Sequence, residues 1–594
     1  MKKNKPDPFD RFFVYSRILV FLLPFALYCS ALGLGFVFFD DDVLVLENQQ
    51  VIHDPASLGK IFTTDVFIGK TVPYYRPLLN VALMIGARAS GTNPGGYHLV
   101  SVLIHCLNCL SLLWLLTLLG FSKPKALIGS LFFSIHPLIS NAVFWIPAVN
   151  DLLITLFGLL SFATFLKFVQ QKHWKYLLLH LLAFAGAFFS KESAVALPFL
   201  FLLYFFLTRK RILEPGNFPV YITWFGVILL WYFLRRNSIG ELQGDEQGIG
   251  AIIKNLPFLP EIVSKFFLSY NLPVMPVFSV FYTVSGIIII LLLILLSVVA
   301  KKMDACLFLL GLAWFLAFAI PNMFLRQYNT NDSFDYLEHR ACLPSAGLLI
   351  MILAMIPETW VDVRDRSVRI AIPVLLTILA LFTLLQEGKY KDGESYWTSV
   401  LKVSPDRAWF HHLYGRYCFK QQDFVKFEEQ LQEAVRIKPY GTFYYNLGMI
   451  ELMQKRKFES AYNYFTKAIE MGETKPEVMR NFVNLCIESA GALSKSGSND
   501  KASERIEAAL KYDPANTVAL MNLALFSLNL GDYAKSVNLW NKVVQIDPSS
   551  LSAWKNLYFF YANSADHRDS SNYFATQYVK FGGKKEDLTN RQKF

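Results

Sequence analysis

Long apolar runs dominate the first two thirds of this 594-residue chain. A helix needs about 20 apolar residues to cross a bilayer. Eleven runs approach that length, namely Val14–Leu34, Leu99–Leu119, Lys125–Ile146, Leu152–Phe168, Trp174–Phe189, Ala194–Leu207, Val220–Leu234, Tyr282–Ala300, Leu307–Asn322, Ala341–Ile356 and Ile370–Leu385. A chain with this pattern is expected to be a membrane protein that crosses the bilayer many times.

Charge divides the chain in the same way. Residues 401–594 hold 26 basic and 21 acidic side chains, about 24% of 194 positions, whereas residues 1–400 hold 31 and 25, about 14%. Soluble domains carry about 25% charged residues. The front is therefore membrane-like and the tail soluble-like, which excludes a disordered chain and an ordinary cytosolic enzyme.

Basic residues between the runs predict the orientation. The segment Phe258–Pro276 is a doubtful twelfth run, because it contains Glu261 and Lys265, and we interpret it as an interfacial amphipathic helix. With eleven spans every basic connection falls on the cytoplasmic side, from Lys2, Lys3, Lys5 and Arg11 through Lys123/Lys125, Lys172/Lys175, Arg209–Arg211 and Lys301/Lys302 to Arg364, Arg366 and Arg369. We expect a cytoplasmic N-terminus, a bacterial inner membrane and a periplasmic tail, with no cleaved signal peptide.

The tail contains an internal repeat. Asp513-Pro514 and Asp547-Pro548 lie 34 residues apart, and Asn446-Leu447-Gly448 resembles Asn522-Leu523-Ala524. A 34-residue helix–turn–helix period resembles the tetratricopeptide repeat, whose stacked units leave a groove for peptides or proteins. Five units are expected, at 407–440, 441–476, 477–516 (lengthened by a polar loop, Ser494–Asp500), 517–550 and 551–583.

These features predict an all-α chain in four parts. Residues 1–388 are expected to form the transmembrane domain and residues 389–406 a linker. Residues 407–583 are expected to form the repeat solenoid and residues 584–594 a polar tail.

Polar side chains gather on the predicted outer side of the membrane domain. Ionisable groups in or beside spans are costly and usually functional. They are Asp40, Asp41, Asp42, Asn48, Arg76, His98, His136, Asp151, Lys191, Glu192, Glu338, His339 and Arg340. Carboxylates that face Lys and Arg suit a reaction in which a hydroxyl loses a proton while an anion leaves.

Each group has a structural alternative. Asp40–Asp42 could be a helix cap, Lys191-Glu192 a surface ion pair, Arg76 a snorkelling residue and Glu338–Arg340 a membrane anchor. His98 and His105 share a helix face but have no third ligand, and the seven cysteines form no paired motif. No metal site is predicted; a divalent metal cofactor stays open as an alternative that no motif supports.

The order of these motifs resembles one family. Phe39-Asp40-Asp41, Asn48, Tyr75-Arg76-Pro77-Leu78, Gly96-Tyr97-His98-Leu99, His136-Pro137, Asp151, Lys191-Glu192 and Glu338-His339-Arg340 are similar to the transmembrane and tetratricopeptide-repeat O-mannosyltransferases and their bacterial relatives. The resemblance covers nearly the whole chain. It implies a GT-C glycosyltransferase fold and a lipid-phosphate-linked sugar as donor. Departures from the family pattern are Asn141 for a Glu, Ala148-Val149 for Gly-Arg, Ser101 for Asn and Ala341-Cys342 for Leu-Tyr.

The expected function is transfer of one sugar, with mannose as the expected sugar, from a polyprenyl phosphate to Ser or Thr hydroxyls of extracytoplasmic proteins. Asp41 or Asp40 is expected to take the hydroxyl proton. Arg340 and Lys191, with His339 and Arg76, are expected to hold the leaving phosphate. Asp42, Asn48, His98, Glu192 and Glu338 are expected to support them.

The expected partners are membrane lipids, the polyprenyl-phosphate sugar and acceptor proteins bound to the repeats, with no nucleic acid. Two other functions remain open. One is a glycosyltransferase that acts on a lipid or glycan, and the other is a non-catalytic scaffold anchored in the membrane.

Overall fold

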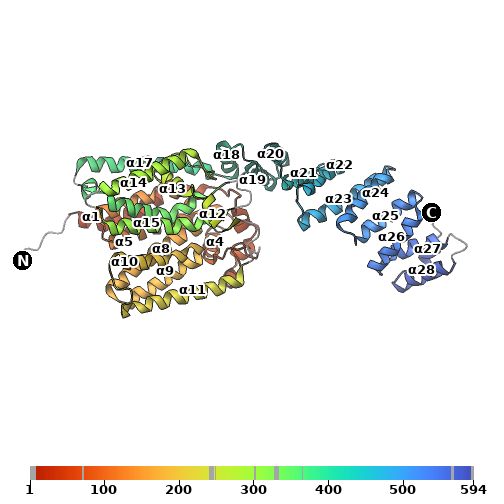
Figure 1. The fold of residues 1–594 in the computed structure, drawn as a ribbon, viewed down its shortest axis with the longest axis horizontal. Coiled ribbons are helices and arrows are strands. Elements are labelled where there is room, and N and C mark those ends of the chain that lie inside the picture. Colours follow the sequence, from red (N-terminus) through yellow and green to blue (C-terminus); the bar gives the residue numbers. More distant parts are fainter. Residues whose placement is uncertain are drawn as a thin grey trace, which may run out of the picture. The chain divides into compact units, whose positions relative to one another are not determined.

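The computed structural model describes residues 8–69, 72–239, 246–247, 249–299, 303–326, 334–363, 365–562 and 568–589. The chain forms two compact units, Met1–Phe410 and His411–Phe594, which are described separately. Figure 1 shows that both are built from helices. Across the described ranges, the strands are one antiparallel pair, β1 (Glu246–Gln247) and β2 (Leu325–Arg326). The predicted all-α class is confirmed.

The first unit contains eighteen α-helices in its described part. In chain order they are α1 (Pro8–Tyr28), α2 (Gln49–Ile52), α3 (Leu58–Ile61), α4 (Pro77–Ser90), α5 (Pro94–Leu118), α6 (Lys123–Ser134), α7 (Pro137–Phe144), α8 (Val149–Gln171), α9 (Trp174–Ser190), α10 (Leu197–Leu207), α11 (Phe218–Ser238), α12 (Ile249–Lys254), α13 (Phe258–Phe267), α14 (Val280–Val299), α15 (Ala305–Ala319), α16 (Cys342–Met355), α17 (Arg366–Glu387) and α18 (Gly393–Val403).

All eleven predicted runs are helical, but they differ in length. Within the described residues, eight helices are long and apolar enough to cross a membrane by themselves. The ninth candidate is the pair α6–α7, which is bent by 53°. Its break lies at His136-Pro137, where the proline ring favours the start of a new helix. The two remaining runs, α9 and α10 with the short helix before it, are shorter apolar helices, so eleven spans remains a prediction.

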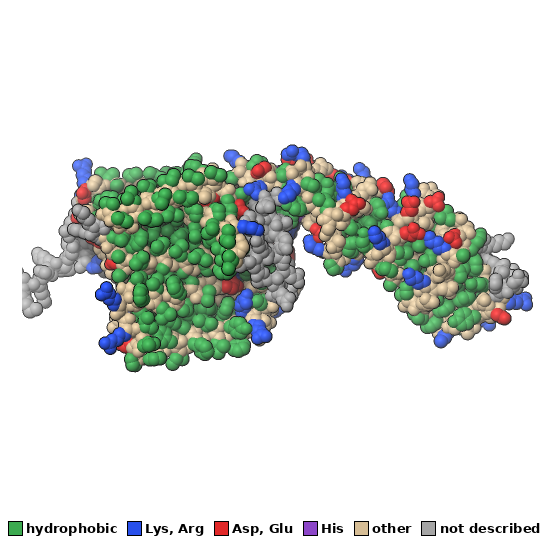
Figure 2. Space-filling model, in the orientation of Figure 1, with side chains coloured by type: hydrophobic (Ala, Val, Ile, Leu, Met, Phe, Trp, Pro, Cys, Tyr) green, Lys and Arg blue, Asp and Glu red, His purple; other side chains and the backbone are tan. Residues whose placement is uncertain are grey.

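Apolar side chains cover the outside of this unit. Figure 2 shows hydrophobic side chains over most of its visible face. On α14, Val280 and Phe281 are exposed, as are Ile370 on α17 and Phe225 on α11. By contrast, α8 and α16 are almost entirely buried. An apolar exterior around a packed centre is what a bilayer requires, and the chain is a multi-pass membrane protein.

The doubtful segment 258–276 does not span, and its polar groups do not face outward. Helix α13 has ten residues, too few to cross a bilayer. Glu261 and Lys265 are fully buried against other helices. The prediction of an interfacial helix is therefore wrong in one respect. The ionisable side chains of α13 have partners inside the protein instead of facing water.

Two glycines bring α15 and α16 into close contact. A Cβ atom on Gly311 would lie 2.5 Å from the backbone nitrogen of Met351, and one on Gly347 would lie 2.5 Å from that of Phe315. Small residues let membrane helices approach closely, since packing rather than the hydrophobic effect holds them together. The pairing fixes the height of α16 against its neighbour.

Residues 389–406, predicted to be a linker, are instead an ordered part of the first unit. They include most of the 3₁₀ turn Gly388–Tyr390 and the whole of α18. Tyr390, Tyr396 and Trp397 are buried. The sequence did not reveal this, because the buried aromatic face of so short a helix is not visible as a long apolar run.

The second unit consists of helix pairs. They are α19 (Ala408–Lys420) with α20 (Phe424–Ile437), α21 (Gly441–Met453) with α22 (Phe458–Glu470), α23 (Pro476–Lys495) with α24 (Asn499–Tyr512), α25 (Thr517–Asn529) with α26 (Tyr533–Ile546), and α27 (Leu551–Ala562) with α28 (Arg568–Lys580). Each expected repeat holds one pair. Gly448 shows why small residues recur, because a Cβ there would lie 2.6 Å from the ring of Phe465 on the paired helix.

Two details of the repeats differ from expectation. The extra length of the third unit lies in α23, which has 20 residues and includes Ser494 and Lys495, so the predicted polar loop is short. The expected polar tail folds back in part, since Leu588 is buried in the core beneath α27 and α28. Lys2, Lys3, Lys5, Lys301, Lys302 and Arg364, which entered the orientation argument, lie outside the described residues.

Candidate active site

The loop from Leu34 to Asp42 presents the predicted catalytic acids. Phe38 (φ 58°) and Asp40 (φ 70°) both have left-handed backbone conformations. Asp tolerates this region better than most residues, yet such positions cost about 1–3 kcal/mol and persist only where the surroundings hold them. The loop runs into Asp42–Leu46, which form one turn of π-helix, an arrangement frequent at functional sites.

Asp41 holds this loop together. One carboxylate oxygen accepts the N–H of Val37 at 2.7 Å and the other accepts the N–H of Phe39 at 2.8 Å. Its side chain is 1% exposed. Burial raises the pKa of Asp41 to about 7, against the two backbone N–H groups, which lower it. Asp41 therefore fixes the loop, while Asp40 is only partly buried and more accessible to a substrate.

Aromatic rings clamp Phe39, the residue before Asp40. Its ring stacks on Trp145 with centroids 5.3 Å apart and meets Trp397 edge-on at 6.0 Å. The indole N–H of Trp145 donates to the carbonyl of Phe39 at 2.9 Å. The N–H of Gly35 donates to the carbonyl of Lys391, just before α18, at 2.7 Å. The loop thus lies between Trp145 and the segment that contains α18.

Two ion pairs bring the predicted basic residues into one cluster. Lys191 Nζ lies 2.7 Å from Asp151 Oδ1, and both side chains are at most 10% exposed. Arg76 Nε lies 3.0 Å from Glu192 Oε2, whose other oxygen accepts the N–H of Tyr75. Lys191 and Glu192 therefore each pair with a residue distant in the sequence and do not form a surface ion pair with each other. Arg76 is held by Glu192 and does not snorkel to lipid head groups.

The short 3₁₀ helix η8 (Glu338–Ala341) completes the cluster. His339 Nε2 lies 3.6 Å from Asp151 Oδ2, and its ring contacts Trp145 at 4.8 Å. Arg340 is within electrostatic range of Asp151, Arg76 and Asp40. Among the described residues, its guanidinium makes neither a hydrogen bond nor an ion pair. A partly buried cation without a partner, close to a carboxylate, is suited to bind an anionic group.

Of the other predicted site residues, Asn48 has a structural contact, whereas Asp42 and His98 are buried. Asn48 donates to the carbonyl of Val43 at 2.8 Å and so shapes the first loop. Asp42 is buried at the start of the π-turn. His98 is buried within α5, and His105, seven residues later, contacts the carbonyl of Ser134. No group of three or more His, Cys, Asp or Glu side chains that could hold a metal is found in the described part of the chain.

Sequence reasoning missed a second buried network. Lys265 Nζ lies 2.6 Å from Glu338 Oε1, and both side chains are fully buried. Asn141 donates to the other oxygen of Glu338 at 2.7 Å. Glu261 accepts from the hydroxyl of Tyr336 at 2.5 Å. The signal was present in two charges within the short apolar segment 258–276, but their partners lie far away in the sequence.

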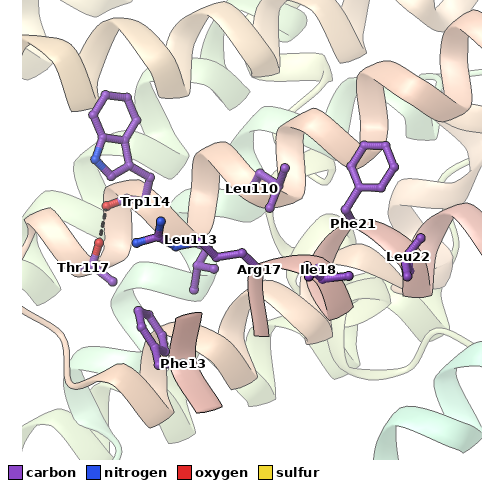
Figure 3. Close-up of a pocket in the computed structure, with 9 residues that line it drawn as sticks. All are labelled: Phe13, Arg17, Ile18, Phe21, Leu22, Leu110, Leu113, Trp114 and Thr117. Atoms are coloured by element: carbon purple, nitrogen blue, oxygen red, sulfur yellow. Dashed lines mark hydrogen bonds between the residues drawn. The ribbon is translucent and has the colours of Figure 1, made fainter. Parts of the chain in front are cut away.

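A separate groove of about 630 Å³ lies between α1 and α5 (Figure 3). Its lining is apolar except for Arg17 and Thr117, with Phe13, Phe21 and Trp114 as the largest side chains. None of the residues of the polar cluster lines it.

Comparison with known families gives the class of protein. Residues 75–233 match the dolichyl-phosphate-mannose-protein mannosyltransferase family. Residues 383–442, 441–472 and 489–550 match tetratricopeptide repeats. The chain thus joins a multi-pass helical membrane domain with a mannosyltransferase-like region to tetratricopeptide repeats.

Its similarity to particular proteins confirms the resemblance found in the sequence. Protein O-mannosyl-transferase TMTC3 of Mus musculus is 20% identical over 612 residues, which cover 90% of this chain and 64% of that protein. Protein O-mannosyl-transferase TMTC1 of Homo sapiens is 29% identical over 242 residues, 39% of this chain and 25% of that protein. Tmtc1 of Drosophila melanogaster is 28% identical over 182 residues, 29% of this chain and 20% of that protein. The chain spans between a fifth and just under two thirds of the length of these relatives.

Proposed function

We propose that this protein is a membrane glycosyltransferase that moves one sugar, mannose, from a polyprenyl phosphate to Ser or Thr hydroxyls of extracytoplasmic proteins. The observation that carries the proposal is the guanidinium of Arg340, which has no hydrogen-bond or ion-pair partner among the described residues and lies within electrostatic range of the partly buried Asp40. A base and an anion-binding cation at one site are the two groups that this transfer needs. The names of the similar proteins support the sugar and the protein acceptor.

In the proposed reaction, Asp40 accepts the proton of the acceptor hydroxyl while the oxygen attacks the anomeric carbon. The bond from that carbon to the phosphate oxygen breaks, and the polyprenyl phosphate leaves with the bonding electrons. Arg340 binds the charge that develops on the phosphate, because a guanidinium can donate two parallel hydrogen bonds. Lys191 and Arg76 are each paired with a carboxylate and lie within electrostatic range of Arg340. A single displacement inverts the anomeric configuration.

The repeats are proposed to bind the acceptor. In the second unit, a groove of about 700 Å³ opens between α25 and α27. Asn522, Asn529, Asn556 and Ser552 are among its lining residues, and none of the ten lining side chains is charged. Neutral amides and hydroxyls can donate to and accept from a peptide backbone. Tethering the groove to the membrane unit raises the local concentration of a bound acceptor.

Activity is tested with purified protein, a polyprenyl-phosphate mannose donor and two acceptors, a Ser/Thr-rich peptide and a glycolipid. Transfer to the peptide with inversion is expected. Transfer to the glycolipid alone would overturn the protein acceptor. If sugar is transferred to neither acceptor, the result would favour a non-catalytic scaffold. Mass spectrometry of extracytoplasmic proteins with and without the gene identifies the natural acceptors.

Deletion from Asp406 onward tests the role of the repeats and keeps α18. The truncated protein is expected to show a raised acceptor constant for full-length protein substrates and near-normal hydrolysis of the donor by water, which needs only the first unit. Both rates are normalised to folded protein. Equal loss of the two activities would mean that the repeats only stabilise the enzyme.

We also propose that the N-terminus is cytoplasmic and that residues 389–594 lie in the periplasm, since eleven spans place every basic connection inside. Reporter fusions after Lys302 and after Lys391 test this. A cytoplasmic signal after Lys391 would contradict both the orientation and the proposed access of acceptors.

A further inference from the structure

The ion pair between Lys265 and Glu338 has no evident role in stability. Both side chains are 0% exposed, and their charged atoms lie 2.6 Å apart. Removing two charges from water costs several kcal/mol per ion, so well-packed apolar residues in their place often give an equally or more stable protein. Ionisable pairs within membrane domains usually mark function instead. The proposed reaction assigns no part to Lys265.

The position of Glu338 in η8 indicates what Lys265 does. A 3₁₀ helix has three residues per turn, so successive side chains point about 120° apart. Glu338 contacts Lys265 and Asn141, whereas His339 faces Asp151. Arg340, the third residue, is within electrostatic range of Tyr74, Asp151, Arg76 and Asp40. The rotation of this single turn therefore sets the direction of Arg340.

A four-residue helix cannot set its own rotation, because short helical turns are unstable in isolation. Glu338 is held from two elements, by Lys265 on α13 and by Asn141 on α7. Lys265 in turn lies over the rings of Tyr336 (4.7 Å) and Tyr282 (5.0 Å), which limit its movement.

The neighbouring carboxylate, Glu261, does not compete strongly for Lys265. Its oxygens accept from the hydroxyls of Tyr336 and Thr283 and from the N–H of Ser279. The ammonium of Lys265 therefore remains directed at Glu338. This contact explains why a ten-residue helix carries two charges into the interior.

We propose that Lys265 is a positioning residue that acts through Glu338 to orient η8, so that the guanidinium of Arg340 points at the phosphate of the donor. The inference rests on the proposed function for the identity of that phosphate. It assigns a role to α13 in aligning the site.

The test uses the full chain in detergent with farnesyl phosphate as the probe. Lys265→Met alone leaves an uncompensated buried carboxylate and is expected to fold poorly. The informative variant is therefore Lys265→Met/Glu338→Gln, which removes both charges and keeps an acceptor for Asn141. It is expected to melt within a few degrees of the wild type but to bind farnesyl phosphate at least tenfold more weakly.

Two further variants make the result specific. Adding Arg340→Gln to the double variant is expected to cause little further loss, because both changes disable the same contact. Lys125→Met, which removes another buried lysine from an ion pair in this unit, is the matched control and should leave binding unchanged.

Wild-type affinity in the folded double variant would overturn the inference, and so would a loss that adds in full to that of Arg340→Gln. A wild type that binds farnesyl phosphate but transfers sugar to no protein would contradict the proposed function alone. In that case the binding measurements would still support or reject the role of Lys265.

Discussion

Ion pairs of the same length have different surroundings in the two units. Lys191–Asp151 in the first unit and Lys535–Glu507 in the second both measure 2.7 Å. The side chains of the first pair are 10% and 6% exposed, and those of the second 40% and 53%. A buried pair holds its groups in one geometry and is costly to break, whereas an exposed pair contributes about 0–1 kcal/mol. Distance alone therefore does not identify a functional charge, but burial in an apolar unit does.

The comparison predicts that, among single charge removals in the membrane unit, the loss of the Asp40 carboxylate lowers the transfer rate most. Asp40→Asn keeps the shape of the side chain and abolishes its basicity. Transfer is expected to fall by roughly 10²–10⁴-fold, the range for general-base catalysis, with normal insertion. Asp54→Asn, a change at an exposed capping residue further along the same loop region, is the control. Near-normal turnover of Asp40→Asn would leave the acid with only a structural role.

The second prediction concerns Arg340, a cation that has no ion-pair partner in the described part of the membrane unit. Arg340→Gln is expected to reduce kcat for transfer by roughly 10²-fold, the cost of losing one preorganised charge-stabilising donor. Arg340→Lys should recover part of it, because the charge returns without the two-pronged geometry. Arg17→Gln, in the groove between α1 and α5, should change little. An equal fall in kcat for Arg17→Gln and Arg340→Gln would mean that the total positive charge matters, and not a local contact of Arg340 with the phosphate.

The third prediction separates packing from positioning. Trp397→Ala and Trp224→Ala each remove a buried indole, and each should cost about 3–5 kcal/mol of stability. Trp397 touches Phe39 beside Asp40, whereas Trp224 packs on Phe201. Only Trp397→Ala is expected to lower kcat per folded molecule, by up to roughly 10²-fold if the acid is displaced by about 1 Å. A similar kcat in both variants would mean that α18 does not align the loop.

The fourth prediction concerns pH. The pKa of Asp41 is about 7 in the folded protein and 3.8 in its ordinary state. The folded state therefore binds the proton more tightly than the unfolded state, and Asp41 lowers stability as pH rises from about 4 to 7. The loop needs the carboxylate as a double acceptor, so transfer should fall about tenfold per pH unit below 7. Opposite slopes of melting temperature and activity are expected, and Asp41→Asn should remove this stability slope.

The smallest effect is expected in the repeats. Lys535→Ala removes an exposed partner of Glu507 and should change the free energy of unfolding by less than about 1 kcal/mol. Chemical denaturation of the full chain, read from a probe in the second unit, measures it. A loss several times larger would mean that exposure is a poor guide to the value of these pairs.

The two units also differ in how far sequence could predict them. In the repeats, a period of 34 residues and the Asp-Pro pairs at Asp513 and Asp547 were enough to locate every helix pair. Each repeat contacts mainly its neighbours, so local patterns determine its structure. The lengthening of the third unit was predicted, but its position in α23 and the packing of Leu588 were not, because neither follows from the 34-residue period.

In the membrane unit the helices were predictable but their contacts were not. Long apolar runs marked the spans, and the ionisable residues near them included most of the cluster. Which charge pairs with which could not be read, since Glu338 meets Lys265, 73 residues away, and Arg76 meets Glu192, 116 residues away. Burial of Tyr396 and Trp397 was hidden for a similar reason, because their partners belong to the first loop of the chain.

The glycine contact between α15 and α16 influences the alignment of the site from a distance, because it sets the position of α16. The turn η8, which contains Arg340, precedes α16 directly, and Gly347 lies seven residues after Arg340, about two helical turns along. Any side chain on Gly347 must push the helix away from Gly311 and carry η8 with it. Laboratory evolution toward bulkier donors should therefore select substitutions at Gly311 and Gly347, although neither residue can touch a sugar.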